Sequence, residues 1–260
     1  MRKETASTWE ELNALLWEKS FDSVSRKWRP YTAFRGLAKR HGNLKTSLQR
    51  LGGDLRWKER RVIDSFRMYA RDDFRHGLTD WNVLLLGQHH RLPTRLLDWT
   101  SSPLAAMYFA SEKNPKEDGE VWCVARLQTN NALSPTFANL LRKQGTNLFS
   151  LETLSSNFPE MEAFDSVEAA AADKSLLFFE PPSLSPRIVN QYAFFSVMTD
   201  PYSETHSWIE AHKRWCWKVI VPAALKKEIR ERLLVMNISE RTIYPGLDGV
   251  SQWLQAYYQE

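Results

Sequence analysis

The chain has 260 residues, of which 43% are hydrophobic and 25% are charged, and its net charge is +4. These values are those of an ordinary globular protein and exclude a disordered or fibrous chain. No apolar run approaches the roughly 18–20 residues that cross a bilayer, and residues 1–17 lack the basic and then apolar pattern of a secretory signal. We therefore expect a cytoplasmic protein with no membrane partner.

The two cysteines, Cys123 and Cys216, are far apart in the sequence. Two isolated cysteines in a domain of this size predict reduced core residues, and the four-ligand spacing of a structural zinc site is absent.

The charges are distributed unevenly along the chain. Between Arg26 and Arg75, fifteen Lys and Arg residues stand against five Asp and Glu residues, whereas between Gly145 and Pro182 seven acidic residues stand against Lys174 alone. The basic span has two interpretations. It is a surface that attracts nucleic acid or a phosphorylated ligand, or it is a solvated helix face that pairs with the acidic segment, within one molecule or between two.

The first elements are a helix, a strand and a long helix. Thr8 and Glu11 form a capping box, which predicts that the chain opens with a helix. The short aromatic run at residues 28–34 predicts a strand that ends at Arg35-Gly36. Residues 58–76 carry apolar side chains on one side, so they predict a long helix with Gly77 as its stop.

A further helix, an extended stretch and a third helix follow. Asp80 is placed to cap a helix over residues 81–90, and residues 96–99 are extended. Ser102 then caps another helix, because Pro103 stands at its first position, where proline is preferred.

The second half of the chain is richer in strands. Strands are expected at residues 120–127, 176–179, 188–198 and 215–221, and helices at 223–236 and 248–257. Helices cluster first and strands later, and there is no repeat and no clear linker. This order predicts a single α+β domain, helix-rich in its N-terminal half and strand-rich in its C-terminal half.

The stretch from Gly87 to Ala110 is the richest in polar groups among apolar anchors. Such groups must bond to one another or to a ligand, because leaving one buried and unpaired costs about 1–3 kcal/mol. The stretch therefore predicts either a site-forming loop or a rigid corner braced by an Arg95–Asp98 pair. Its candidate residues are Gln88, His89, His90, Arg91, Arg95, Asp98, Thr100, Ser101, Ser102 and Tyr108.

Several kinds of site are disfavoured. His89 and His90 are neighbours, and on a helix their rings diverge by about 100°, so we expect no metal site. A serine nucleophile with His89 would need a nucleophile elbow, and none is present. The chain has neither a Walker loop nor a Rossmann fingerprint.

Several blocks of the sequence together resemble the FRG-domain family. They occur in the family's order, and they are Phe34-Arg35-Gly36, residues 88–90 with 93–100, residues 103–110, Arg187-Ile188 with Gln191 and Phe194, and residues 244–249. The resemblance extends from Tyr31 to the end of the chain. It implies an N-terminal helical extension at residues 1–25 and an FRG domain at residues 26–260. Two departures are visible, because the family often has glycine at Arg91 and a glycine-containing step at Tyr192-Ala193.

The same blocks resemble, in outline, an ADP-ribosyltransferase of the arginine–serine–glutamate type. That type places an arginine on an early strand, a Ser-Thr-Ser-like strand end running into a helix, and a glutamate or glutamine on a late strand. Arg35, residues 100–102 and Gln191 would be these elements here. The resemblance implies an ADP-ribosyltransferase-like split sheet with NAD, as substrate, in a cleft between two small sheets.

The resemblance also implies roles for individual residues. Arg35 would pair with the pyrophosphate of NAD. The full set of NAD-binding candidates is Arg35, Gln88, Arg95, Thr100, Ser101, Ser102, Tyr108 and Arg187. Gln191 and His89 are the catalytic candidates, with Asp98 or Asp248 supplying the negative charge that Gln191 lacks.

Three of these residues have a structural alternative. Arg35 is equally suited to brace a turn, Gln191 to be an ordinary strand residue, and Asp248 to cap the terminal helix.

FRG domains occur among bacterial and phage proteins, often in toxin or phage-defence settings. The resemblance therefore implies an NAD-dependent ADP-ribosyltransferase that modifies nucleic acid or protein as a toxin or anti-phage effector, with an antitoxin or defence-system partner. Two alternatives stay open. One is a non-catalytic module that binds a nucleotide or nucleic acid, and the other is a hydrolase or nuclease with His89 and Asp98 as an acid–base pair.

Overall fold

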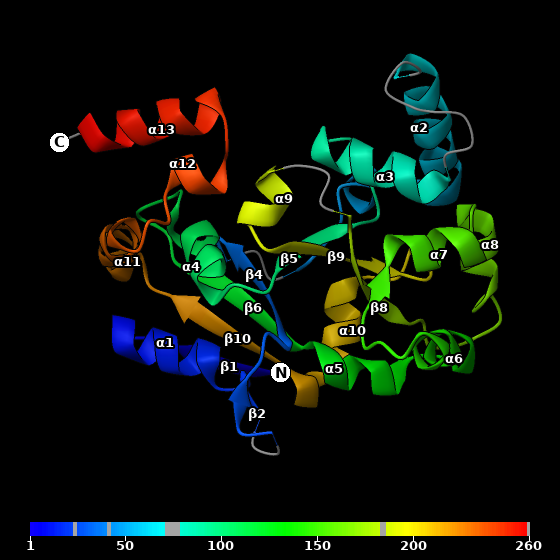
Figure 1. The fold of residues 1–260 in the computed structure, drawn as a ribbon, viewed down its shortest axis with the longest axis horizontal. Coiled ribbons are helices and arrows are strands. Elements are labelled where there is room, and N and C mark those ends of the chain that lie inside the picture. The colour runs from blue at the N-terminus through cyan, green and yellow to red at the C-terminus, as the bar shows by residue number, and fades with distance from the viewer. Residues whose placement is uncertain (23–24, 41–42, 71–78, 183–185, 259–260) are drawn as a thin grey trace.

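A computed structural model of the protein describes residues 1–22, 25–40, 43–70, 79–182 and 186–258. Its centre is an eight-stranded mixed sheet with the order β1-β10-β6-β4-β5-β9-β8-β7 (Figure 1). The strands are β1 (Arg2–Thr5), β4 (Thr32–Leu37), β5 (Leu97–Thr100), β6 (Gly119–Ala125), β7 (Phe149–Ser150), β8 (Leu176–Glu180), β9 (Ala193–Met198) and β10 (Cys216–Val221). Two short strands, β2 (Phe21–Asp22) and β3 (Lys27–Trp28), form a separate hairpin.

Helices cover both faces of the sheet. They are α1 (Trp9–Trp17), α2 (Leu55–Tyr69), α3 (Asp80–His89), α4 (Pro103–Ser111), α5 (Arg126–Thr129), α6 (Pro135–Gln144), α7 (Leu151–Asn157), α8 (Met161–Ser166), α9 (Pro186–Asn190), α10 (Thr205–Ala211), α11 (Ala223–Val235), α12 (Glu240–Ile243) and α13 (Leu247–Tyr258). The mixture of helices and one largely antiparallel sheet confirms the α+β class. The expected division into a helix-rich N-terminal half and a strand-rich C-terminal half is wrong, because β1 to β6 precede Arg126 and α6 to α13 follow it. None of the helices in the described ranges is long and apolar enough to span a membrane.

The sheet narrows to one residue pair at its middle. β4 pairs with β6 along six residues, but on its other side it meets β5 only where Phe34 faces Thr100. The sheet is therefore two half-sheets, β1-β10-β6-β4 and β5-β9-β8-β7, joined at this pair. We call the junction the seam. Arg35 is the first residue beyond it.

Three apolar clusters hold the two half-sheets and their helices together. The first joins α1, α4 and α11 to β4, β6 and β10, and the second joins α3, α6, α7 and α8 to β8 and β9. The third lies on the opposite face and includes α10. The period of two along a strand produces this division, since in β8 Leu177 and Phe179 belong to the second cluster and Leu176 and Phe178 to the third.

The N-terminus differs from expectation. The chain opens with β1, which pairs in parallel with β10, and α1 follows it after Thr8, whose side chain accepts from the Glu11 amide. Residues 1–25, expected as a helical extension, therefore contribute a strand to the main sheet. No strand signal was visible here because β1 is a short polar edge strand, Arg-Lys-Glu-Thr, which pairs only with β10 among the described strands.

The strand expected at residues 188–198 is helical in its first part. α9 runs from Pro186 to Asn190, and β9 begins only at Ala193. Pro186 suits the first position of a helix because its ring fixes φ and it has no N–H to lose. The β-branched and aromatic composition of the run concealed this break.

Other bounds moved by a few residues. β4 continues through Arg35 and Gly36 to Leu37, whereas the sequence predicted that the strand ends at Arg35-Gly36. α2 begins at Leu55, and the expected end of that helix at residues 70–77 lies mostly outside the described residues. Thr79, rather than Asp80, occupies the N-cap position of α3.

Candidate functional site

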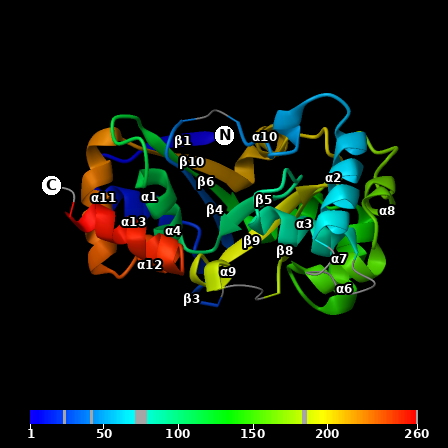
Figure 2. The same ribbon diagram turned by 90° about the horizontal axis from the view of Figure 1, so that it is seen from above.

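A cavity of about 230 Å³ lies at the seam. Helices α3 and α9 flank this part of the sheet (Figures 1 and 2). The cavity brings together seven of the residues singled out from the sequence, namely Arg35, Gln88, His89, Asp98, Thr100, Arg187 and Gln191. They come from four different segments of the chain, so the expected convergence of the early arginine, the histidine and the late glutamine is present.

Arg35 enters the cavity from β4. Its neighbour Gly36 allows α4 to lie directly on the strand, because a Cβ at Gly36 would stand 2.0 Å from the Ala106 carbonyl oxygen. The Arg35 side chain is 20% exposed, and its Nη1 donates to the Asp98 carbonyl oxygen at 2.5 Å. Its Nε is buried and has no partner among the described residues. A charged donor is thus available inside the cavity.

Asp98 is the carboxylate of the cavity. Its Oδ2 accepts from Gln88 Nε2 at 3.0 Å and lies 3.7 Å from Arg35 Nη1. The Gln88 oxygen in turn accepts from the Thr94 hydroxyl, which fixes the orientation of the Gln88 amide at the end of α3. Asp98 remains 56% exposed, so it is accessible to a ligand.

The cavity has an excess of positive charge, since two guanidinium groups, Arg35 and Arg187, stand with one carboxylate. Burial lowers the pKa of Arg35 and Asp98 opposes this, and an arginine keeps its charge at neutral pH in either case. Partial burial, with the positive charges of His90 and Arg187, lowers the pKa of His89 from its ordinary 6.5. His89 is therefore a neutral imidazole at pH 7, able to donate from one nitrogen and accept at the other.

Gln191 is held at the cavity by two contacts. Its Nε2 donates to the Ile243 carbonyl oxygen at 2.9 Å, and its own carbonyl oxygen accepts from the Thr100 hydroxyl at 2.6 Å. Its amide oxygen receives no hydrogen bond from the described residues and is left as an acceptor. Thr100, expected to contact NAD directly, uses its hydroxyl to tie β5 to the turn after α9.

Arg187 and Gln191 are both set by α12 and the residue after it. The Arg187 guanidinium lies 5.5 Å from the centre of the Tyr244 ring, and the Tyr244 hydroxyl donates to Glu112 at 2.7 Å. Gly249 keeps α13 close to this segment, because a Cβ there would stand 1.7 Å from the Tyr244 carbonyl oxygen. Residues 244–249 thus help to position Arg187 and Gln191, which line the cavity, but do not line it themselves.

Five of the NAD-binding and catalytic candidates do not line this cavity. The Ser102 hydroxyl caps α4 by accepting from the Ala105 amide, and the Ser101 amide donates to the Tyr192 carbonyl. Tyr108 is fully buried, with the Arg230 guanidinium 4.2 Å from its ring centre. Asp248 lies in the first turn of α13, where a carboxylate is favoured by the helix dipole.

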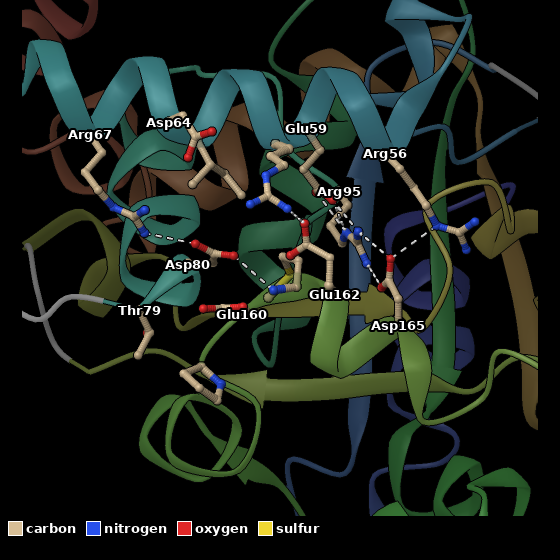
Figure 3. Close-up of a pocket in the computed structure, with 14 residues that line it drawn as sticks. Arg56, Glu59, Asp64, Arg67, Thr79, Asp80, Arg95, Glu160, Glu162 and Asp165 are labelled. Atoms are coloured by element: carbon tan, nitrogen blue, oxygen red, sulfur yellow. Dashed lines mark hydrogen bonds and ion pairs between the residues drawn. The ribbon is translucent and has the colours of Figure 1, made fainter.

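Arg95, the fifth, does not pair with Asp98 as the sequence suggested. It faces a different, charged cavity of about 310 Å³ beneath α2 (Figure 3). Its Nε donates to both Glu59 carboxylate oxygens at 2.8 and 2.9 Å, and its guanidinium also binds Asp165. Arg95 and Glu59 are each 3% exposed, so this is a buried ion cluster.

The basic span and the acidic segment meet at the same place. Arg56 and Arg60 on α2 pair with Asp165 and Glu162. Figure 3 shows Arg56 pointing from α2 toward Asp165. This part of the basic span therefore pairs within the molecule.

The apolar wall of the seam cavity was not anticipated from the sequence. It consists of Phe34, Leu85, Phe109, Ile188 and Phe195, with Trp99 behind. Strand alternation carries a partial signal, because Phe195 is two residues from Ala193 and shares its face.

The two departures from the family pattern both have left-handed backbone. Arg91, just after α3, has φ of 65°, and Tyr192, just after Gln191, has φ of 48°. Glycine adopts this region without strain, so the glycines that the resemblance implies would fit the backbone at both steps.

One comparison with known proteins finds a match. Residues 31–119 match the family model described as the FRG domain. This segment contains Arg35, Gln88, His89, Asp98 and Thr100 of the seam cavity. No curated protein and no solved structure matches the chain.

Proposed function

With an FRG domain at residues 31–119 as the premise, we propose that the seam cavity binds NAD and that the protein is an ADP-ribosyltransferase-like enzyme. The observation that carries the proposal is the buried, unpartnered Nε of Arg35 inside a cavity with a positive excess and an aromatic wall. Such a cavity suits a ligand that joins an anionic group to planar rings, and NAD is one.

Arg35 and Arg187 would take the pyrophosphate. A guanidinium binds phosphate oxygens through two parallel N–H donors, and such charge-assisted bonds are stronger than neutral ones. Arg35 uses Nη1 on the Asp98 carbonyl, so its Nε and remaining N–H groups are available.

The aromatic wall would contact the nicotinamide ring. Phe34 and Phe195 come from the two half-sheets, so a flat group between them would lie across the seam.

In the reaction, the bond between the nicotinamide nitrogen and the ribose C1′ breaks and nicotinamide leaves with the electron pair. The acceptor then bonds to C1′ and releases a proton. Asp98 is the carboxylate placed to stabilise the positive charge that develops at C1′, whereas Asp248 lies outside the cavity. Gln191 would accept a hydrogen bond from a ribose hydroxyl, and neutral His89 would take the acceptor's proton.

Nucleic acid or protein would be the acceptor, and toxin or anti-phage activity with a neutralising partner would follow from the setting of the family. One observation favours a second candidate function, a module that binds the nucleotide without reacting. Gln191 is uncharged, and its amide nitrogen donates to the Ile243 carbonyl oxygen. The late position at which the resemblance allows a glutamate therefore has no carboxylate.

Arg35→Ala tests the proposal. NAD binding should weaken by about 10- to 150-fold, as expected for a lost hydrogen bond to a charged group, and nicotinamide release should disappear. Calorimetry measures the binding and chromatography the nicotinamide. Arg40→Ala is the matched control, because Arg40 is exposed and pairs with Asp118 at 3.7 Å.

Arg35→Lys separates charge from geometry, since lysine cannot form the two parallel bonds. The proposal is wrong if Arg35→Ala binds NAD as tightly as the wild-type protein. Binding without nicotinamide release, in the presence of cell lysate as a source of acceptor, would support the non-catalytic module instead.

A further inference from the structure

α2 divides its cations between two faces. On the inner face, Arg56, Arg60 and Arg67 each pair with a carboxylate. On the outer face, Lys58 donates to the carbonyl oxygens of residues 51 and 52, and Arg61 has no carboxylate within ion-pair distance in the described part of the chain. Carboxylates in the described part of the chain therefore leave the positive charge of the outer face unpaired.

The outer face is also hollowed and aromatic. A shallow groove of about 370 Å³, which we call the α2 groove, is lined by nine residues, none of them acidic: Leu51, Trp57, Lys58, Arg61, Val62, Ser65, Phe66, Tyr69 and Leu92. Trp57 is 60% exposed and Tyr69 84% exposed. The Arg61 guanidinium lies 5.9 Å from the centre of the Trp57 ring, so it stands beside the exposed indole.

Exposed aromatic faces next to unneutralised cations are the chemistry that recognises unpaired bases on a phosphate chain. Bases stack on the rings, and phosphates interact with Lys and Arg. We propose that the α2 groove binds single-stranded nucleic acid. A duplex fits this chemistry poorly, because its bases are already stacked on one another.

The groove and the seam cavity are connected through the last turn of α3. Leu92, which lines the groove, folds back onto α3 through a hydrogen bond from its amide to the Gly87 carbonyl oxygen at 2.8 Å. The next two residues after Gly87, Gln88 and His89, line the seam cavity. In this proposal, a strand held in the groove would present a nucleotide to the cavity. Its role as the acceptor rests on the proposed function, whereas the binding itself does not.

The test is fluorescence anisotropy of the full chain with labelled oligonucleotides of about 12 nucleotides, a length within the range of known single-strand sites. Separate titrations with oligo(dT), oligo(rU) and a DNA duplex distinguish DNA, RNA and paired bases. Arg61→Glu and Trp57→Ala should each weaken single-strand binding by about tenfold or more. Trp57→Phe should restore most of the affinity, since phenylalanine keeps a stacking face.

Two control variants make equivalent changes elsewhere. Lys227→Glu applies the same charge change at a side chain that is 89% exposed on α11, and Tyr258→Ala removes an exposed ring on α13. Both should change the affinity less than about twofold, as is usual away from a contact. Thermal unfolding confirms that each variant is folded.

Several results would overturn the inference. One is an absence of oligonucleotide binding at low salt, and another is an equal loss of affinity in Lys227→Glu. The others are duplex binding as tight as single-strand binding, and a Trp57→Ala variant that loses affinity for a protein partner but not for the oligonucleotide. NAD titrations of the same samples keep the two proposals apart, because Arg61→Glu should bind NAD normally. If the wild-type protein fails to bind NAD, the proposed function is wrong and the oligonucleotide result still decides the groove.

Discussion

Arg35 and Gly36 are neighbours with separate tasks. Gly36 lets the α4 backbone approach β4, and Arg35 uses the resulting position beside the seam to reach the cavity. The sequence indicated Arg35, Gln88, His89, Asp98 and Gln191 because they stand in recognisable blocks.

The NAD-binding set predicted from the sequence also included Arg95 and Tyr108, which stand in the same blocks. They do not line the cavity, because side-chain direction depends on tertiary packing. Arg95 points to Glu59, a residue 36 positions away, and no local pattern links the two.

Backbone strain at Arg91 gives a prediction at the residue scale. A residue with a Cβ in left-handed backbone costs about 1–2 kcal/mol, and glycine's greater freedom in the unfolded state offsets about 0.5–1 kcal/mol of the gain. Arg91→Gly should therefore increase the free energy of unfolding by up to about 1.5 kcal/mol. Urea denaturation measures it, and Arg91→Ala, which keeps the Cβ, should give no such gain. Destabilisation by the glycine would show that the Arg91 side chain contributes more than its backbone costs.

At the scale of elements, α2 and α9 are the informative cases. The amphipathic pattern of α2 was readable, but its division into a paired and an unpaired cationic face was not, because the partners Glu162 and Asp165 lie about 100 residues later. α9 was hidden in a strand-like run, and the contacts of Asn190 and Gln191 with α12 join residues 52 positions apart in the sequence.

The buried cluster beneath α2 gives the prediction for this scale. Arg95→Ala leaves Glu59 and Asp165 without their shared cation, and breaking a buried pair in this way costs about 3–5 kcal/mol. Thermal and chemical unfolding measure the loss. Arg60→Ala removes an exposed pair with Glu162 and should cost less than about 1 kcal/mol. Weaker NAD binding by Arg95→Ala at unchanged stability would return Arg95 to the NAD site.

At the scale of the whole molecule, the α+β class and most strands followed from composition and periodicity. The strand order could not be predicted, because antiparallel neighbours such as β5 and β9 are far apart in the sequence. They come together only through the packing of the helices that lie between them in the chain. β1 was missed because an edge strand of polar residues has no apolar pattern, and only its pairing with β10 identifies it.

The single Phe34–Thr100 pair makes the middle of the sheet its weakest line. The β4–β6 ladder has six pairs, so its amides should exchange with solvent only on global unfolding, whereas those at Phe34 and Thr100 should exchange through local opening. Any molecule that binds there contacts both half-sheets and links one to the other. Hydrogen–deuterium exchange should therefore slow at residues 34 and 97–100 when NAD is added, with little change in β6. Uniform slowing, or none, would mean that the two halves already move as one body.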